Sequence, residues 1–92
     1  MIVPFYPVYV PTSSEFSALE TFAELAKSRA DLVRLCGLLP TASLEARLAA
    51  TDYVLVHQYQ GLLARGHGLE AAAILAMHRA RHIRMAAERR AA

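Results

Sequence analysis

The choice between an all-helical and a mixed fold rests on residues 44–65, LEARLAATDYVLVHQYQGLLAR. The central nine residues, TDYVLVHQY at 51–59, are rich in β-branched and aromatic side chains and taken alone would suit a strand. The flanking segments LEARLAA and LLAR consist of strong helix formers. Four leucines also recur on one helical face: Leu44, Leu48, Leu55 and Leu62. The sequence therefore predicts a single helix over residues 42–65, capped by Thr41 or Ser43.

Two further helices are predicted, one on each side of this segment. Residues 13–36 carry apolar side chains at spacings of three and four, and Ser13 or Ser14 can cap the start of this helix. Gly37 is expected to supply a left-handed C-cap, and Pro40 prevents the helix from continuing.

The third predicted helix covers residues 69–89 and follows a turn at residues 66–68. At about 100° per residue, its buried centre line would consist of Leu69, Ala73, Ala76, Ala80, Ile83 and Ala87. Three long helices with short connections indicate an all-α fold, a small up-down-up three-helix bundle. Its core is predicted to include Leu19, Phe22, Leu48, Leu55, Leu62 and Ile83.

Residues 1–12 are predicted to form an extended arm outside the bundle. Pro4, Pro7 and Pro11 remove backbone donors and exclude a central strand. Three aromatic side chains make this arm strongly apolar: Phe5, Tyr6 and Tyr9. Because an apolar segment is costly to expose to water, we expect the arm to cover a groove on its own bundle or on another subunit.

The composition indicates a single helical domain, residues 1–92, with more apolar side chains than an ordinary soluble domain. Apolar residues make up 55% of the chain and charged residues 20%, so part of the apolar surplus is expected to contact a protein partner or a second copy. The lone Cys36 cannot form an intrachain disulfide, and the N-terminal segment lacks the basic start of an export signal. We therefore expect a cytoplasmic protein that does not enter a membrane.

Basic residues concentrate in the last third of the chain, around HRARHIR at residues 78–84. Residues 1–60 hold four basic and six acidic side chains, whereas residues 61–92 hold six basic and two acidic ones. On the predicted third helix, a second stripe away from the buried centre line would carry Ile74, His78, Arg81, His82, Met85 and Arg89. Together with the arm aromatics Phe5, Tyr6 and Tyr9, these residues are predicted to form a partner-binding interface.

HRARHIR also allows two other interpretations, a metal site and a nucleic-acid contact. His78 and His82 have the four-residue spacing that lets two imidazoles reach one metal ion, but no cysteine or carboxylate stands within the same turns. Phosphate binding would draw on five arginines, which are spread around the helix: Arg79, Arg81, Arg84, Arg89 and Arg90. No metal site is therefore predicted, and nucleic-acid binding is retained as an alternative.

Catalytic patterns are absent from the sequence, which has no glycine-rich phosphate loop, no nucleophile elbow and no H-E-x-x-H. We therefore expect neither an enzyme nor a cofactor-binding protein, and we infer no small-molecule substrate. The predicted function is a small helical protein-protein interaction module, an adaptor, inhibitor or accessory subunit that self-associates. The alternative is a nucleic-acid-binding regulator that uses the basic C-terminal helix.

Overall fold

The computed structural model describes residues 13–91 and the side chains from Ser17 to Arg90. These residues form four α-helices, α1 (Ser13–Leu38), α2 (Ala42–Ala64), α3 (Gly68–Met77) and α4 (Arg81–Ala91). The all-α prediction is confirmed, and the strand-like segment 51–59 lies entirely within α2. The predicted arm, with Phe5, Tyr6 and Tyr9, lies outside the described residues.

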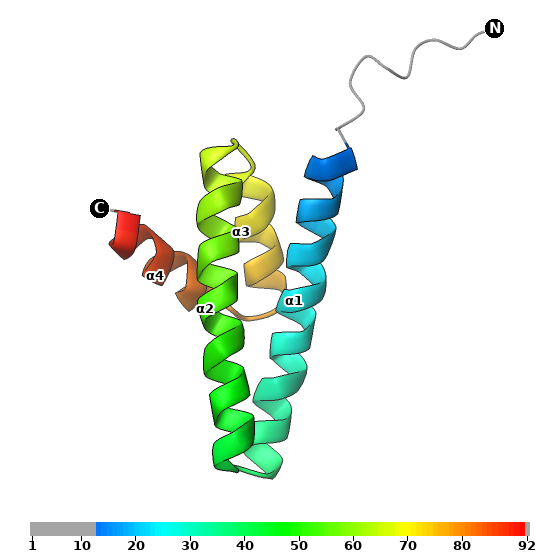
Figure 1. The fold of residues 1–92 in the computed structure, drawn as a ribbon, viewed down its shortest axis with the longest axis vertical. Coiled ribbons are helices and arrows are strands. Elements are labelled where there is room, and N and C mark those ends of the chain that lie inside the picture. The colour runs from blue at the N-terminus through cyan, green and yellow to red at the C-terminus, as the bar shows by residue number, and fades with distance from the viewer. Residues whose placement is uncertain (1–12, 92) are drawn as a thin grey trace, which may run out of the picture.

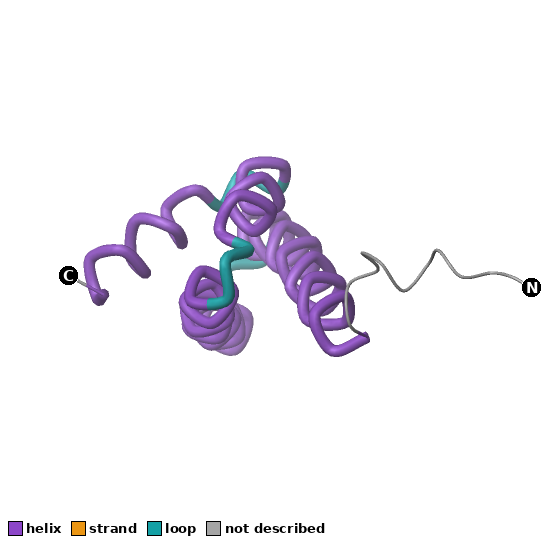
Figure 2. Tube along the Cα trace, turned by 90° about the horizontal axis from the view of Figure 1, so that it is seen from above, coloured by secondary structure: helices purple, strands orange, loops and turns teal. Residues whose placement is uncertain are grey.

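The two long helices α1 and α2 form an antiparallel hairpin, and the two short helices pack against only part of it. Figure 1 shows α1 and α2 close together at their connection and further apart at the other end, where α3 lies alongside both. Viewed from above, α4 leads away from the other three helices, past α2 (Figure 2). With ten residues α3 is only about 15 Å long, so it leaves the hairpin uncovered near its connection.

The core lies where α3 and α4 meet the hairpin. It contains four of the six residues predicted to be buried: Phe22, Leu55, Leu62 and Ile83. The Phe22 and Tyr59 rings meet at its centre, with their centroids 6.5 Å apart. Leu19 and Leu48 are only half-buried. Leu19 belongs to the second turn of α1, and the first turns of α1 are where the two long helices diverge; Leu48 belongs to the second turn of α2, near the connection that the short α3 leaves uncovered.

The prediction of one continuous third helix is wrong, because the chain breaks between Met77 and Arg81. Arg79 adopts a left-handed backbone conformation, with φ at 57°. Its N–H donates to the Ala76 carbonyl at 3.2 Å, and the Ala80 N–H donates to the Leu75 carbonyl at 2.7 Å. This pair of bonds is a Schellman motif, in which the left-handed residue is usually glycine. Arginine at this position gives no sequence signal for the break.

The break also changes which side of the third segment is buried. Ala71 and Leu75 of α3 face the core, as do Ala80 and two residues of α4, Ile83 and Ala87. On one straight helix these two groups would lie roughly 130° apart, so only a broken helix can bury both. Consequently three residues of the predicted centre line are exposed instead: Leu69, Ala73 and Ala76.

The other helix ends show which sequence signals were reliable. Gly66 has φ at 88° and accommodates the predicted turn after α2, and the Thr41 hydroxyl accepts a hydrogen bond from the Leu44 N–H at 3.2 Å as the predicted N-cap. Gly37, however, is not a C-cap, since α1 continues to Leu38. Pro40 ends this helix instead, because it disfavours helical geometry in the preceding residue.

None of the described helices is long and apolar enough to span a bilayer.

We expect Leu55→Ala to lower the free energy of unfolding by about 2–5 kcal/mol, because the substitution leaves a cavity in a fully buried site. Urea denaturation followed by circular dichroism measures the change. Leu63→Ala is the control on the same helix, and its 43% exposure predicts a much smaller loss. Equal losses for the two variants would contradict the burial described for α2.

Arg79→Gly should raise the free energy of unfolding by about 0.5–1 kcal/mol, because glycine adopts the left-handed conformation without a clash of its Cβ. Ala76→Gly within α3 should instead cost about 1 kcal/mol. The same urea titrations report both values. A continuous helix through residue 79 would make both substitutions destabilising, and that result would refute the break.

Candidate partner-binding surface

The outer face of α3 is the most exposed apolar surface of the short helices. We define this face by Leu69, Ala73, Ala76 and Met77, all of which are exposed. Leu69 is 88% exposed and Met77 is 74% exposed. The only charged residue in the ten-residue helix is Glu70. The four residues lie on one side at spacings of three and four, so they form a short apolar ridge with two alanines in its middle.

A notch between α3 and α4 continues the outer face of α3. It has a volume of about 610 Å³ and is lined by Ala72, Leu75 and Ala76 from α3 and by Arg81, Arg84 and Met85 from α4. Met85 is 59% exposed at its edge. Arg84 Nε donates to Glu88 Oε2 at 2.9 Å, which places an ion pair on the α4 side of the notch. The combined surface is apolar in its centre and charged along one edge.

The structure brings only part of the predicted interface together. Arg81 and Met85 line the same notch, while Ile74 is half-buried against the core. His78 is the C-cap residue of α3 and lies before the break, whereas His82 and Arg89 belong to α4 beyond it. The single stripe expected from a continuous helix is therefore divided. Phe5, Tyr6 and Tyr9 lie outside the described residues.

A polar cluster of Arg29, Asp52 and His82, here named the Arg29 cluster, joins α1, α2 and α4. Arg29 is 8% exposed, and among the described residues it is the one buried charged side chain. Its Nε donates to Asp52 Oδ1 at 2.5 Å, and its Nη2 donates to His82 Nε2 at 2.9 Å. A guanidinium cannot accept a hydrogen bond, so His82 Nε2 is the acceptor in this contact. The Arg29 cluster thus links α4 to α1, two helices whose backbones do not pack together.

Sequence reasoning did not single out Arg29, although a signal for it exists. Arg29 falls on the same helical face as Phe22, Ala26 and Val33, so it is a charge on an apolar stripe. Such a residue must find a partner once the stripe is buried. The partner here is Asp52, which accepts a hydrogen bond from Arg29 across the α1–α2 interface.

The two histidines of HRARHIR do not share the geometry that their spacing suggested. His78 ends α3, and the left-handed Arg79 separates it from His82 in α4. Within residues 13–91 no three histidine, cysteine or carboxylate side chains gather closely enough to hold a metal ion. The His82 Nε2 atom, moreover, is already bonded to Arg29.

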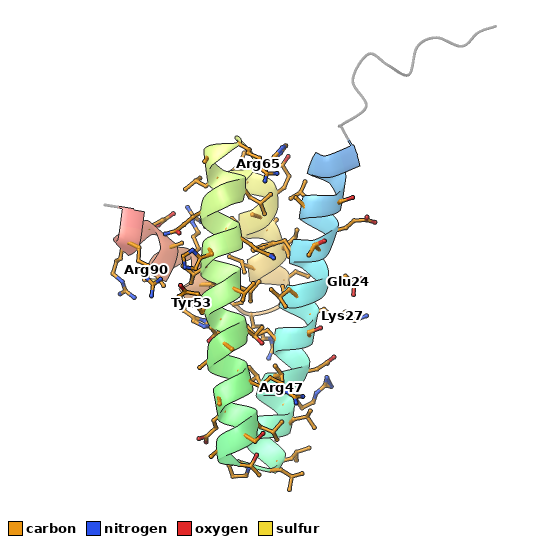
Figure 3. The ribbon with its side chains drawn as sticks, in the orientation of Figure 1. Glu24, Lys27, Arg47, Tyr53, Arg65 and Arg90 are labelled. Atoms are coloured by element: carbon orange, nitrogen blue, oxygen red, sulfur yellow. The ribbon has the colours of Figure 1, made fainter. Side chains whose placement is uncertain are left out.

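Several arginines that could bind phosphate are engaged within the chain. The hydrogen bond and charge of Glu88 raise the pKa of Arg84, and the Arg90 guanidinium lies 5.8 Å from the centroid of the Tyr53 ring (Figure 3). In α1, Arg34 donates to Asp31 and holds the pKa of that carboxyl below its usual range. Exposed pairs of this kind contribute little to stability, but they leave fewer cations directed at a ligand.

Comparisons of the chain with protein-family models, curated proteins and solved structures gave no match. The chemistry and geometry of its exposed residues are therefore the basis for a function.

Asp52→Ala should lower the free energy of unfolding by about 1–3 kcal/mol, because it leaves the buried Arg29 guanidinium without its carboxylate. This loss is smaller than the roughly 3–5 kcal/mol expected on breaking a fully buried ion pair, because the Asp52 side chain is 31% exposed. The double variant Arg29→Met with Asp52→Leu should recover most of the loss, since it removes both charges.

Asp31→Ala is the matched control, because it breaks an exposed pair with Arg34 in the same protein. It should leave the denaturation midpoint nearly unchanged. If Asp52→Ala were as mild as Asp31→Ala, the Arg29 cluster would have no part in holding α4 on the hairpin.

Proposed function

We propose that the protein is a small helical interaction module that binds protein chains, including a second copy of itself, and that it has no catalytic activity of its own. The observation that carries this proposal is the outer face of α3, in which Leu69 and Met77 are 88% and 74% exposed. An adaptor, an inhibitor or an accessory subunit would each use such a surface.

The spacing and size of the residues on the outer face of α3 favour a helical partner. Leu69, Ala73, Ala76 and Met77 follow the i, i+4, i+7, i+8 pattern by which one helix anchors on another. The two alanines allow a second helix to approach closely, and the larger side chains at each end can pack beside it. A second copy offers the same face, so two copies can pair about a two-fold axis.

The notch toward α4 enlarges the surface available for such a contact. A stable interface buries about 800 Å² on each partner, more than four side chains of one short helix provide. Met85 and the aliphatic part of Arg81 extend the apolar area from α3 onto α4. Arg81, Met85 and the outer face of α3 would then belong to one interface, with Arg84 and Glu88 at its polar rim.

Nucleic-acid binding by α4 is the alternative, supported by four arginines against the single Glu88. Two of these arginines are already engaged, Arg84 with Glu88 and Arg90 with Tyr53. The salt dependence of binding distinguishes the two functions, because phosphate contacts weaken steeply as the salt concentration rises and an apolar interface does not. The interaction module predicts an oligomer mass that is nearly independent of salt and no salt-sensitive binding to duplex DNA or RNA.

Ala73→Glu combined with Ala76→Glu should reduce self-association at least tenfold, because two carboxylates would be buried in the interface without partners. Multi-angle light scattering across a concentration series measures the mass. Ala46→Glu is the control, since Ala46 is also an exposed alanine within a helix but lies on α2. Met85→Asp tests the α4 part of the same surface.

Each variant should keep the helical circular dichroism of the parent chain, because all of the changed positions are exposed. If the α3 double variant and Met85→Asp both retain the parent mass and bound proteins, the interface lies elsewhere and the proposed surface is wrong. If the parent chain is monomeric and brings down no protein from its native cell, the proposed function itself fails.

A further inference from the structure

A second apolar surface, the α1–α2 groove, lies at the end of the hairpin where the two helices diverge. The α1–α2 groove has a volume of about 670 Å³ and is lined by residues of α1 and α2 and by Arg65, the C-cap residue of α2. Ala18 and Thr21 of α1 lie along one side, with Tyr53, Val54, Gly61 and Leu62 of α2 on the other. This volume lies within the range of about 300–1,000 Å³ that is typical of small-molecule binding clefts.

Gly61 keeps the α1–α2 groove wide at the cost of helix stability. It lies within α2, where glycine is less favourable than alanine. A Cβ atom built at Gly61 would meet no atom within 4 Å, so close packing inside the described chain does not require glycine there. A larger side chain would project into the groove and occupy the space that a docked segment needs.

Gln58 adds a directional requirement. Gln58 lines the groove, and its Oε1 atom is buried and accepts no hydrogen bond from the described residues. A buried acceptor without a donor is unfavourable, so an occupant that brings an N–H or O–H group is favoured once the Gln58 side chain turns toward the groove. A purely aliphatic occupant would leave this atom unpaired.

We propose that residues 1–12 of the same chain dock in the α1–α2 groove. The segment ends at Thr12, directly before Ser13 begins α1, and Ser17 one turn later already lines the groove. Figure 1 shows that the start of α1 and the end of α2 lie at the same end of the molecule, whereas α4 lies on the far side of α2. The α1–α2 groove is therefore nearer to the segment than the HRARHIR surface that the sequence suggested.

The length of the segment matches the groove. From Tyr53 to Arg65, whose side chain lies at the upper end of α2 in Figure 3, the α2 side of the groove is about 18 Å long at 1.5 Å per residue. Twelve residues in an extended, proline-rich conformation span about 37 Å. Half of the segment is enough to fill the groove, and the rest allows the chain to reverse direction before Ser13.

The chemistry of the segment matches as well. Residues 2–12 carry no charged side chain, and the groove lining is mainly apolar with Arg65 as its only formally charged residue. Phe5, Tyr6 and Tyr9 supply rings for the apolar lining. The tyrosine hydroxyls can donate to Gln58 Oε1. The backbone N–H groups can also donate to it, at the positions of the segment that are not proline. The rings are then buried without a second protein.

A spin label on residue 3 tests this docking in the full-length chain. Cys36 is the only cysteine, so Cys36→Ser with Val3→Cys gives a single labelling site. Docking predicts paramagnetic broadening of the backbone amides of Thr21, Val54 and Gly61, with little effect at Ile74 and Met85. Broadening at Ile74 and Met85 instead would overturn the proposal and place the segment on α3 and α4.

Gly61→Leu should abolish the broadening at Thr21 and Val54 by filling the groove. Gly37→Leu is the matched control, because Gly37 is also a helical glycine with open space around its Cβ position but does not line the groove. Replacing Phe5, Tyr6 and Tyr9 by serine should also abolish the broadening while leaving every helix unchanged. Broadening that survives both sets of changes contradicts the docking.

A mixture of spin-labelled chain without ¹⁵N and ¹⁵N-labelled chain without the spin label distinguishes docking within one chain from exchange between two chains. Docking within one chain predicts no broadening in this mixture, and broadening there would mean that each copy lends its segment to another. Broadening in neither sample also overturns the proposal. Ala73→Glu with Ala76→Glu should leave the groove signals unchanged, so failure of self-association through α3 and failure of docking are separate results.

Discussion

The left-handed backbone of Arg79 determines the arrangement of the second half of the chain. By ending α3 after ten residues, it leaves the part of the hairpin near the α1–α2 connection without a third helix. It also turns Ala71 and Leu75 toward the core before the break and Ile83 and Ala87 toward it afterwards. A continuous helix could bury only one of these pairs, so the apolar outer face of α3 is a direct consequence of the break.

The break also brings α4 into contact with the buried Arg29. Once α4 leaves the line of α3, its first turn brings His82 to Arg29 on α1. Apolar packing could replace the Arg29 cluster at similar stability, but it would not specify the direction of α4 as closely, because hydrogen bonds to a planar guanidinium fix both distance and orientation. The second contact of α4 is also directional: Gln60 Nε2 on α2 donates to the Ala87 carbonyl at 3.3 Å. Two polar contacts thus orient a short helix that has little apolar area of its own.

The sequence was sufficient to predict the helices whose caps and apolar faces follow common patterns. It was insufficient where a residue adopts a backbone conformation that is unusual for its type. The leucines of α2 and the cap at Thr41 predicted that helix correctly despite its strand-like centre. The predictions at Gly37 and Arg79 were wrong for opposite reasons. Gly37 remains within a helix although glycine often ends one, and Arg79 adopts the left-handed conformation that glycine usually takes. The predicted interface stripe was divided for the same reason, because helical periodicity beyond Arg79 refers to a helix that does not continue. Residue patterns report local preference, whereas the break is favoured by burial of Ala80, Ile83 and Ala87, which only the folded chain provides.

The apolar surplus of the composition is distributed over surfaces with different chemical requirements. The outer face of α3 contains small and aliphatic side chains and no buried unpaired polar atom, so any complementary apolar helix, including its own copy, can satisfy it. The end of the hairpin exposes larger side chains, Leu35, Leu38 and Leu39. The α1–α2 groove combines a mainly apolar lining with Gln58, whose buried Oε1 has no donor among the described residues, so it favours an occupant that is apolar and also donates a hydrogen bond. If residues 1–12 dock there as proposed, docking carries no entropic cost of bringing two molecules together, so the groove would be filled at any protein concentration, whereas the proposed contact on the α3 face requires a second molecule.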